Sequence, residues 1–397
     1  MDPPEYGYEY WKYYHSDCEL VHVIWTDYCG ILHEKLVPAD SFGRMYRKHA
    51  YNIFDSDDLI PLTVSAAALT SLPDGKSAAE KIYPSYNICD LTPDYDTIQP
   101  CIDNRSRATV FAKVEVGDGP LADPREILKE VCDGLGSGKK REIRASLEFQ
   151  FVLRHLSDGK LCLSNGDGPA QAIVQKLARA LRTHGLSATG LSIRSSDISM
   201  EGVVTIALFM SDNVLEAIDN FYRVKRALHS IASLENLRPS FFYAAENVSS
   251  AAFSGTPLEV MCKNKLRCRL HLAHASKHAR DFAAGIMEAE ETSANPSVYS
   301  FTKPNWLTYG QRRQYQGGLS PEREWMTWGV RNSKTTINFP EGCEAGRLEF
   351  GDIDCMANMY LVGAAIVTLG TRRIAHPVAL KDIPQAFEKA HGFMGRC

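Results

Sequence analysis

Residues 146–153 read SLEFQFVL, an apolar segment with one acid, Glu148, and one amide, Gln150, at its centre. The aromatic and aliphatic neighbours predict a strand, and side chains two positions apart on a strand project from the same face of its sheet. Glu148 and Gln150 are therefore expected to point together into the space beside that face. A buried strand that carries this pair predicts the floor of a polar pocket.

A second segment, GRLEFGDID at 346–354, shows the same alternation of polar and apolar side chains. Strand spacing puts Arg347 and Glu349 on one face and Leu348 on the other. Taken alone, Arg347 and Glu349 form an intramolecular ion pair; taken with Glu148, they line a polar pocket. Carboxylates that converge in a sheet suit magnesium, which prefers oxygen ligands, or general acid/base chemistry.

The segment HLAHASKH at 271–278 contains three histidines. On a strand His271 and His274 face opposite sides, because they are three positions apart. Zinc ligation from a strand favours an HxH spacing, so the segment does not predict a dedicated zinc site. Arg269 shares a face with His271, and Leu272 shares a face with His274.

Length and composition favour two domains in a globular protein. The chain has 397 residues, 44% hydrophobic and 23% charged, which is enough to build a large core. A hairpin pattern at 19–38 and a strand at 108–116 precede a helix start at Asp123, followed by Pro124 and Glu126. We therefore place the boundary near residue 117, between domains at 1–117 and 118–397. Amphipathic helices are predicted at 168–185 and 213–234, and a core helix at 356–370.

Charge and cysteine usage narrow the partners and the compartment. The net charge of −4 argues against nucleic-acid binding, and the sequence has no apolar run of the roughly 18 residues that a membrane helix needs. The 11 cysteines are scattered without a CxxC pair, which is typical of reduced thiols. These features predict a cytoplasmic protein without a nucleic-acid or membrane partner.

Seven segments, in order, resemble motifs of the glutamine synthetase superfamily, type I branch. The resemblance runs from about residue 19 to about residue 390. Within the superfamily, the sequence is similar to the glutamine synthetase-like domains of fungal developmental regulators and to γ-glutamyl-amide ligases. The segments are PSYNICDLTPDYDTIQP (84–100), DPREILKEV (123–131), SLEFQFVL (146–153), MSDNVLEAIDNFYRVKRAL (210–228), NPSVYSFTK (295–303), MTWGVRNSKTTINFP (326–340) and GRLEFGDIDCMANMYLVGAA (346–365).

The resemblance implies an α+β fold with an N-terminal β-grasp domain and a catalytic domain built on a curved antiparallel sheet with flanking helices. It also implies a funnel-shaped small-molecule site between neighbouring subunits and a ring-type homo-oligomer of about ten or twelve chains. Enzymes of this kind phosphorylate a carboxylate with magnesium-ATP, and an amine then displaces the phosphate.

Carried onto this sequence, the implied two-metal site is eroded. Glu148 matches the first glutamate of the family's ExE motif, and Gln150 replaces the second. The two further glutamates of the substrate-side metal fall at Ile206 and near Asp197 or Ile198. An amide and an aliphatic side chain cannot supply the charge that holds a divalent ion, so this metal site is predicted to be lost.

The nucleotide-side metal retains Glu148 and Glu349 as a residual ligand pair. The family's HxHxS motif aligns so that Leu272 replaces the ligand histidine and His274 remains as the phosphate-side histidine. An alternative with a one-residue bulge brings His271 into the ligand position. Magnesium and ATP are thus the implied cofactors, and their binding is predicted to be weakened or lost.

The substrate and phosphate clamps have changed as well. The arginine that binds the substrate carboxylate becomes Lys303, and two other arginines become Asn338 and Gly351, whereas Arg347 survives. The latch aspartate corresponds to Asp55. Lysine and asparagine do not reproduce the bidentate clamp of a guanidinium group.

Three functional hypotheses follow. In the first, the inherited pocket serves a different small molecule, in fungal secondary metabolism, without two-metal ATP chemistry. Glu148 or Glu349 is then the acid/base. The substrate is oriented by His274, Lys303 and Arg347, and Gln150 and His271 also line the pocket. In the second, the chain is a divergent magnesium-ATP-dependent C–N ligase with a changed acid or amine. In the third, it is a non-catalytic ring-forming scaffold or regulator.

Overall fold

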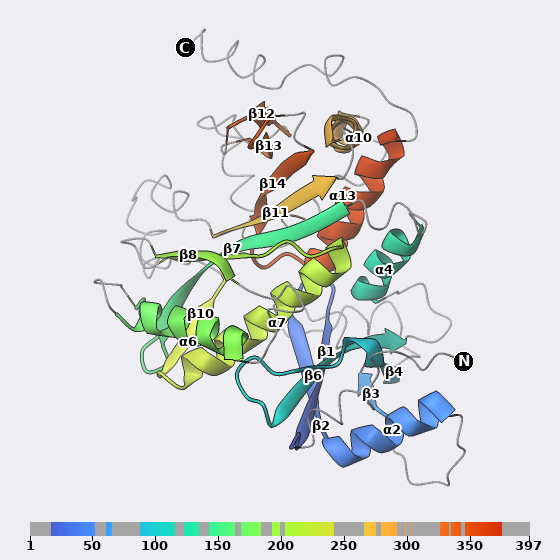
Figure 1. Ribbon diagram of the computed structural model, residues 1–397, viewed down its shortest axis with the longest axis vertical. Coiled ribbons are helices and arrows are strands. Elements are labelled where there is room, and N and C mark those ends of the chain that lie inside the picture. Colours follow the sequence, from blue (N-terminus) through green and yellow to red (C-terminus); the bar gives the residue numbers. More distant parts are fainter. Residues whose placement is uncertain are drawn as a thin grey trace, which may run out of the picture.

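The computed structural model describes two sheets and the helices that pack on them (Figure 1). The described residues are 17–51, 61–65, 88–115, 123–134, 143–162, 168–183, 193–198, 203–241, 266–274, 279–291, 298, 302, 326–332, 335–342 and 346–374.

The N-terminal sheet has the strand order β2-β1-β6-β4-β3, with β5 paired to β6. Strands β1 and β6 run parallel, and the other pairs are antiparallel. The elements are β1 (Leu20–Thr26), β2 (Leu32–Pro38), α2 (Ala39–Tyr51), β3 (Thr63–Ser65), β4 (Ile88–Pro93), η2 (Tyr95–Thr97), β5 (Gln99–Pro100) and β6 (Arg107–Glu115). Helix α2 inserts Phe42 and Tyr46 into the small core of this sheet, where both rings contact Tyr95.

The larger sheet has the order β12-β13-β14-β11-β7-β9-β8, with β10 paired to β7. Its described pairs are antiparallel except for β12 with β13. The strands are β7 (Ile143–His155), β8 (Ile193–Ile198), β9 (Val203–Leu208), β10 (Leu237–Ser240), β11 (Arg267–His274), β12 (Trp328–Val330), β13 (Ile337–Phe339) and β14 (Arg347–Asp354). The predicted α+β fold, with a curved sheet and flanking helices, is confirmed.

The helices are α4 (Pro124–Gly134), α6 (Pro169–Thr183), α7 (Val214–Ser233), α10 (Ala279–Glu291) and α13 (Met359–Ile374). Asp123 begins α4 as predicted, since its carboxylate accepts hydrogen bonds from the backbone N–H groups of Arg125 (2.8 Å) and Glu126 (3.2 Å). Asn213 begins α7 in the same way and accepts from the N–H of Glu216 at 2.8 Å. The boundary near residue 117 stays a prediction; the first sheet ends at Glu115 and the second begins at Ile143.

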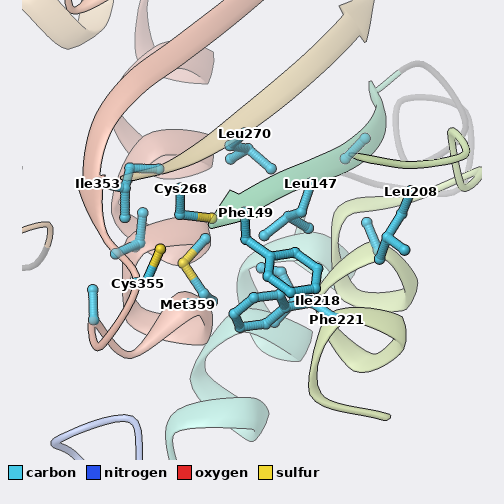
Figure 2. Close-up of a cluster of buried hydrophobic side chains, with 14 of the residues drawn as sticks. Leu147, Phe149, Leu208, Ile218, Phe221, Cys268, Leu270, Ile353, Cys355 and Met359 are labelled. Carbon is cyan, nitrogen blue, oxygen red and sulfur yellow. The ribbon is translucent and has the colours of Figure 1, made fainter. Parts of the chain in front are cut away.

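The face of the large sheet that α7 covers is apolar (Figure 2). Phe149 of β7 is fully buried and meets Phe221 of α7 edge-on, with 5.1 Å between ring centroids. Cys268 and Leu270 of β11 continue this buried surface. Because strand side chains alternate, every residue between these apolar positions faces the opposite side of the sheet. We call that opposite side the polar face.

Buried polar contacts join the first sheet to the helix side of the second. Arg125 of α4 donates to Asp219 of α7 through Nε (3.0 Å) and Nη2 (2.9 Å), and to Asp94, next to β4, through Nη1 (2.9 Å). The hydroxyl of Tyr360 donates to Asp219 at 2.6 Å. All four side chains are mostly or fully covered, so this network fixes how the two sheets meet.

The β1–β2 turn is pressed against the start of α13. Gly30 has φ = +77°, and a Cβ there would lie 2.8 Å from the backbone of Ala357, so the turn requires glycine. Asn358 donates from Nδ2 to the carbonyl of Asp27 at 2.5 Å. The turn therefore forms a fixed wall beside α7.

Candidate functional site

Two polar rows cross the polar face of the large sheet. In the first, Arg269 of β11 lies opposite Glu148 of β7, and Glu148 lies opposite Ala207 of β9. The second row places Asn338 of β13, Glu349 of β14, His271 of β11 and Ser146 of β7 directly opposite one another in turn. Opposed residues on neighbouring strands share a face. The predicted meeting of Glu148 and Glu349 on one polar floor is therefore what the backbone register produces.

Glu148 is held by a guanidinium group. Nη1 of Arg269 donates to Oε1 of Glu148 at 3.0 Å. The Glu148 side chain is 19% exposed and that of Arg269 is 31% exposed, so the pair borders solvent. Nη1 is the Arg269 atom that bonds Glu148, which leaves further guanidinium donors for a bound anion.

His271 lies between the two carboxylates. Its Nδ1 is 3.4 Å from Oε1 of Glu349, and its Nε2 is 3.9 Å from Oε2 of Glu148. Asn338 donates from Nδ2 to the second oxygen of Glu349 at 2.8 Å. The hydrogen bond from His271 lowers the pKa of Glu349 to about 2, with further lowering from Asn338 and the Arg269 charge. Glu349 is therefore ionised at neutral pH and orients the imidazole.

Two buried polar atoms of this face lack hydrogen-bond partners within the described part of the chain. They are Nε2 of His271 and Oγ of Ser146, which belong to opposed residues on β11 and β7. Unsatisfied buried polar atoms are rare in folded proteins and often mark a functional place. Because Glu349 holds Nδ1, the remaining nitrogen of His271 is the one available to exchange a proton.

The residues that lie beside Gln150 on strand β9 differ from those that the sequence predicted. Gln150 donates weakly to the hydroxyl of Thr205 at 3.4 Å. Ile206, which we expected in place of a metal-binding glutamate, is fully buried opposite Phe149 in the core. The predicted position of the metal-binding glutamate is therefore wrong by one residue, since a shift of one residue moves a strand side chain to the other face of the sheet. The β9 residues opposite Glu148 and Gln150 are Ala207 and Thr205, which are not metal ligands of the carboxylate type. Asp197 of β8 pairs with Thr205 in backbone register.

The register of β11 also decides between two alignments of the histidine motif. Leu272 is 3% exposed and packs in the apolar core, so it does not face Glu148. His271 is the β11 residue beside Glu148 and Glu349, as in the bulge-containing alternative. The pairing of β11 with β7 runs unbroken from Cys268 to His274; the β-bulge lies in β14, opposite Arg269 and outside the histidine motif, so it does not test the predicted bulge. The backbone of His274 pairs with Ile143, and its side chain lies outside the described residues.

The other predicted substrate-binding residues are separate from this cluster or not described. Arg347 is exposed at the start of β14 and pairs with Glu341 at 2.6 Å. Its position two residues before Glu349 places it toward the edge of the polar face. Lys303 and Asp55 lie outside the described residues.

The described side chains do not fit a divalent metal. Within the residues that the structure describes, no group of three His, Cys, Asp or Glu side chains is arranged to hold a metal ion. The Arg269 guanidinium is hydrogen-bonded to Glu148, and Asn338 and His271 contact the carboxylate of Glu349. A guanidinium group, an imidazole and an amide thus take up carboxylate oxygens that a metal would require.

Arg269 belongs to this site, although the sequence analysis assigned it no functional role. The available signal was its position two residues before His271, on the same strand face. Its partner could not be seen in the sequence, because Glu148 is 121 positions away and is brought opposite Arg269 only by the pairing of β7 with β11.

The fold and this face define a class of α+β proteins in which a curved sheet presents carboxylates beside a helix-covered core. Residues 121–385 match the model of the glutamine synthetase catalytic domain, and the chain belongs to that family.

Two curated relatives show where the similarity lies. The chain is 23% identical to protein fluG of Emericella nidulans over 398 aligned residues, which cover 92% of this chain and 40% of the relative. It is 28% identical to γ-glutamylputrescine synthetase PuuA of Escherichia coli over 170 residues, or 42% of this chain and 34% of that protein. The matched regions thus span well under half of each relative.

Solved structures agree on the fold. A structure described as apo GmaS without ligand has a TM-score of 0.65 and 19% identity, covering 94% of this chain and 82% of its own. A crystal structure described as a novel glutamine synthase homologue has a TM-score of 0.64 and 17% identity, covering 91% and 84%. At these identities the similarity defines the fold alone. No helix in the described part of the chain combines the length and the hydropathy that a membrane span requires.

Proposed function

We propose that this glutamine synthetase-family protein is a small-molecule enzyme that works without a two-metal ATP centre. The ion pair between Arg269 and Glu148 carries the proposal, because it places a protein cation on the carboxylate that the family resemblance assigns to a metal. A guanidinium group neutralises one carboxylate but cannot polarise a phosphoryl group as a bound metal ion does.

The polar face offers acid/base chemistry in place of metal chemistry. Glu349, with its lowered pKa, is a poor proton acceptor and serves as the positioning residue for His271. His271 Nε2 and the Glu148 carboxylate, 3.9 Å apart, are the groups that exchange a proton with a substrate. The partly exposed Arg269 binds an anionic part of that substrate. The proposed substrate is accordingly a small, negatively charged organic molecule, and fungal secondary metabolism is the setting that the resemblance favours.

A second candidate is a divergent magnesium-ATP-dependent C–N ligase with a single metal. The convergence of Glu148, His271 and Glu349 on one face favours it, since these residue types bind magnesium or manganese once the competing cation moves away. The name of the relative PuuA, a γ-glutamylputrescine synthetase, points to the same chemistry in that protein. A cytoplasmic location and a ring-type homo-oligomer remain part of either proposal.

Manganese binding and ATP turnover distinguish the two candidates. Purified protein is titrated with Mn²⁺ and followed by electron paramagnetic resonance, and ADP release is measured with magnesium-ATP, glutamate and a panel of amines. We expect neither saturable Mn²⁺ binding nor amine-dependent ADP release. Saturable Mn²⁺ binding together with amine-dependent ADP release would overturn the proposal and establish the ligase.

Two arginine variants serve as a matched pair in the same assay. Arg269→Ala removes the cation from Glu148 and is expected to create or strengthen one Mn²⁺ site. Arg347→Ala removes an arginine from the exposed pair with Glu341 and is expected to leave Mn²⁺ binding unchanged. Equal behaviour of the two variants would show that Arg269 does not take the place of a metal.

A further inference from the structure

A cavity of about 560 Å³ lies on the helix side of the large sheet, between the two sheets of the chain. Its walls are the β1–β2 turn at Gly30, the middle of α7 around Lys225, the end of β10 with Phe241, and Met356. This volume is in the range of small-molecule sites. The cavity is separate from the polar face, because α7 packs on the opposite side of β7 from Glu148.

Lys225 is a buried cation in the wall of this cavity. Its side chain belongs to a residue that is 8% exposed, and Nζ donates to the carbonyl of Cys355 at 3.2 Å. Among the described residues, no carboxylate lies within ion-pair distance of Nζ. Buried ammonium groups are costly unless a negative charge compensates them.

Aromatic rings supply part of the missing compensation. Nζ of Lys225 lies 4.2 Å from the ring centroid of Phe241, 5.1 Å from that of Phe221 and 5.9 Å from that of Tyr222. The ring of His229, one helical turn after Lys225, lies 6.0 Å from that of Phe241. Such faces stabilise a buried cation less than a full counter-charge would.

The neighbouring cation in the wall is already neutralised. Arg226 donates to Glu34 at 3.1 Å and to Asp103 at 3.3 Å, and its Nη2 contacts His22. The pKa of Glu34 is lowered to about 2, first by the hydrogen bond with His22 and then by Arg226, so Glu34 is ionised. Arg226 therefore has carboxylate partners of its own, whereas Nζ of Lys225 is hydrogen-bonded to a backbone carbonyl and has no carboxylate within ion-pair distance among the described residues.

We propose that this cavity binds a small monocarboxylate with an apolar body, whose carboxylate pairs with Lys225. The turn residues Ile31 and Leu32, together with Phe241 and Met356, supply apolar surface for the body of the ligand. The carboxylate would give Nζ the close counter-charge that the described residues do not supply within ion-pair distance.

The titration of Lys225 gives this site a thermodynamic signature. Desolvation lowers the pKa of Lys225 to about 8, against the smaller raising effects of the groups around it. An anion bound to the ammonium group would raise that pKa again, so binding near pH 8 takes up protons. The pKa of His229 is lowered, by desolvation and by the Lys225 charge, so its imidazole is neutral at pH 8. The groups that face Nζ are Tyr222, His229, Cys268, Asp354 and Cys355.

The test compares a carboxylate with its neutral amide. Binding of 2-naphthoate and 2-naphthamide to the purified chain is measured by isothermal titration calorimetry at pH 8. We expect the carboxylate to bind at least tenfold more tightly than the amide. Lys225→Met keeps the length of the side chain but removes the charge, and is expected to abolish that preference. Lys160→Met, at an exposed lysine outside the cavity, is expected to keep it.

Proton linkage and a blocking variant keep the test decisive if Lys225→Met is poorly folded. Titrations of the wild type in buffers of different ionisation enthalpy should show proton uptake at pH 8 and almost none at pH 6.5. Ile31→Trp, at an exposed position of the turn, should weaken both compounds by filling the cavity mouth. Equal binding of acid and amide by the wild type, binding without proton uptake at pH 8, or a preference that survives in Lys225→Met would each overturn the proposal.

Discussion

The two sides of the large sheet differ in how exposed their charged side chains are and in how those charges are paired. On the polar face, charges border solvent and sit in opposed pairs, such as Arg269 with Glu148 at 31% and 19% exposure. On the helix side, charges are buried: Arg125 is paired with Asp219, while Lys225 faces a cavity with a backbone carbonyl as its hydrogen-bond acceptor. A half-open pair tolerates the loss of a partner because water replaces it. A buried charge does not, so a missing partner there is informative.

The largest effect should follow from breaking the buried network on the helix side. Asp219→Ala leaves the Arg125 guanidinium and the Tyr360 hydroxyl without their acceptor. We expect the free energy of unfolding to fall by about 3–5 kcal/mol, as for other buried pairs that lose one partner. Urea unfolding at pH 7 measures it.

The matched control for that variant is Glu341→Ala, which removes the partner of the exposed Arg347. Its expected cost is about 0–1 kcal/mol. If the two variants lost similar stability, the contrast between buried and exposed charges would fail for this chain.

An intermediate effect should appear in the pH dependence of Lys225. Its pKa is lowered from 10.5 to about 8 in the folded chain, so between these values the unfolded state binds more protons than the folded state. The stability of the wild type relative to Lys225→Met should therefore rise between about pH 8 and pH 10.5, by up to about 3 kcal/mol. Urea unfolding of both proteins across this range checks the slope; parallel pH profiles would contradict the burial of an uncompensated ammonium.

The smallest effect should come from Glu349 on the polar face. Its folded pKa, about 2, is below the usual 4.5, so the stability it contributes is present above about pH 5 and is lost as the pH falls toward 2. Relative to Glu349→Gln, the wild type should lose less than about 1 kcal/mol between about pH 6 and pH 4. Urea unfolding of the wild type and of Glu349→Gln at pH 6 and pH 4 measures this change, and equal changes for the two proteins would contradict the lowered pKa of Glu349.

Local sequence patterns were sufficient for the elements and for the family. Asp123 begins α4 where its capping side chain predicted, and the alternation around Glu148 and Glu349 predicted which side of each strand is polar. These predictions succeed because caps and strand alternation depend on residues only a few positions apart.

Features that depend on pairing between distant segments needed the tertiary structure. Only the offset of β11 against β7 and β14 shows that His271, and not Leu272, stands beside the carboxylates, since a shift of one residue exchanges the faces of a strand. The pairing of β7 with its neighbours likewise shows that Ile206 faces the core and that Glu148 is the partner of Arg269. The sequence by itself thus determined the fold family and the polar positions of each strand. Tertiary structure decided which charges meet, and which one, Lys225, is left facing a cavity, because desolvation and charge pairing are properties of three-dimensional neighbours.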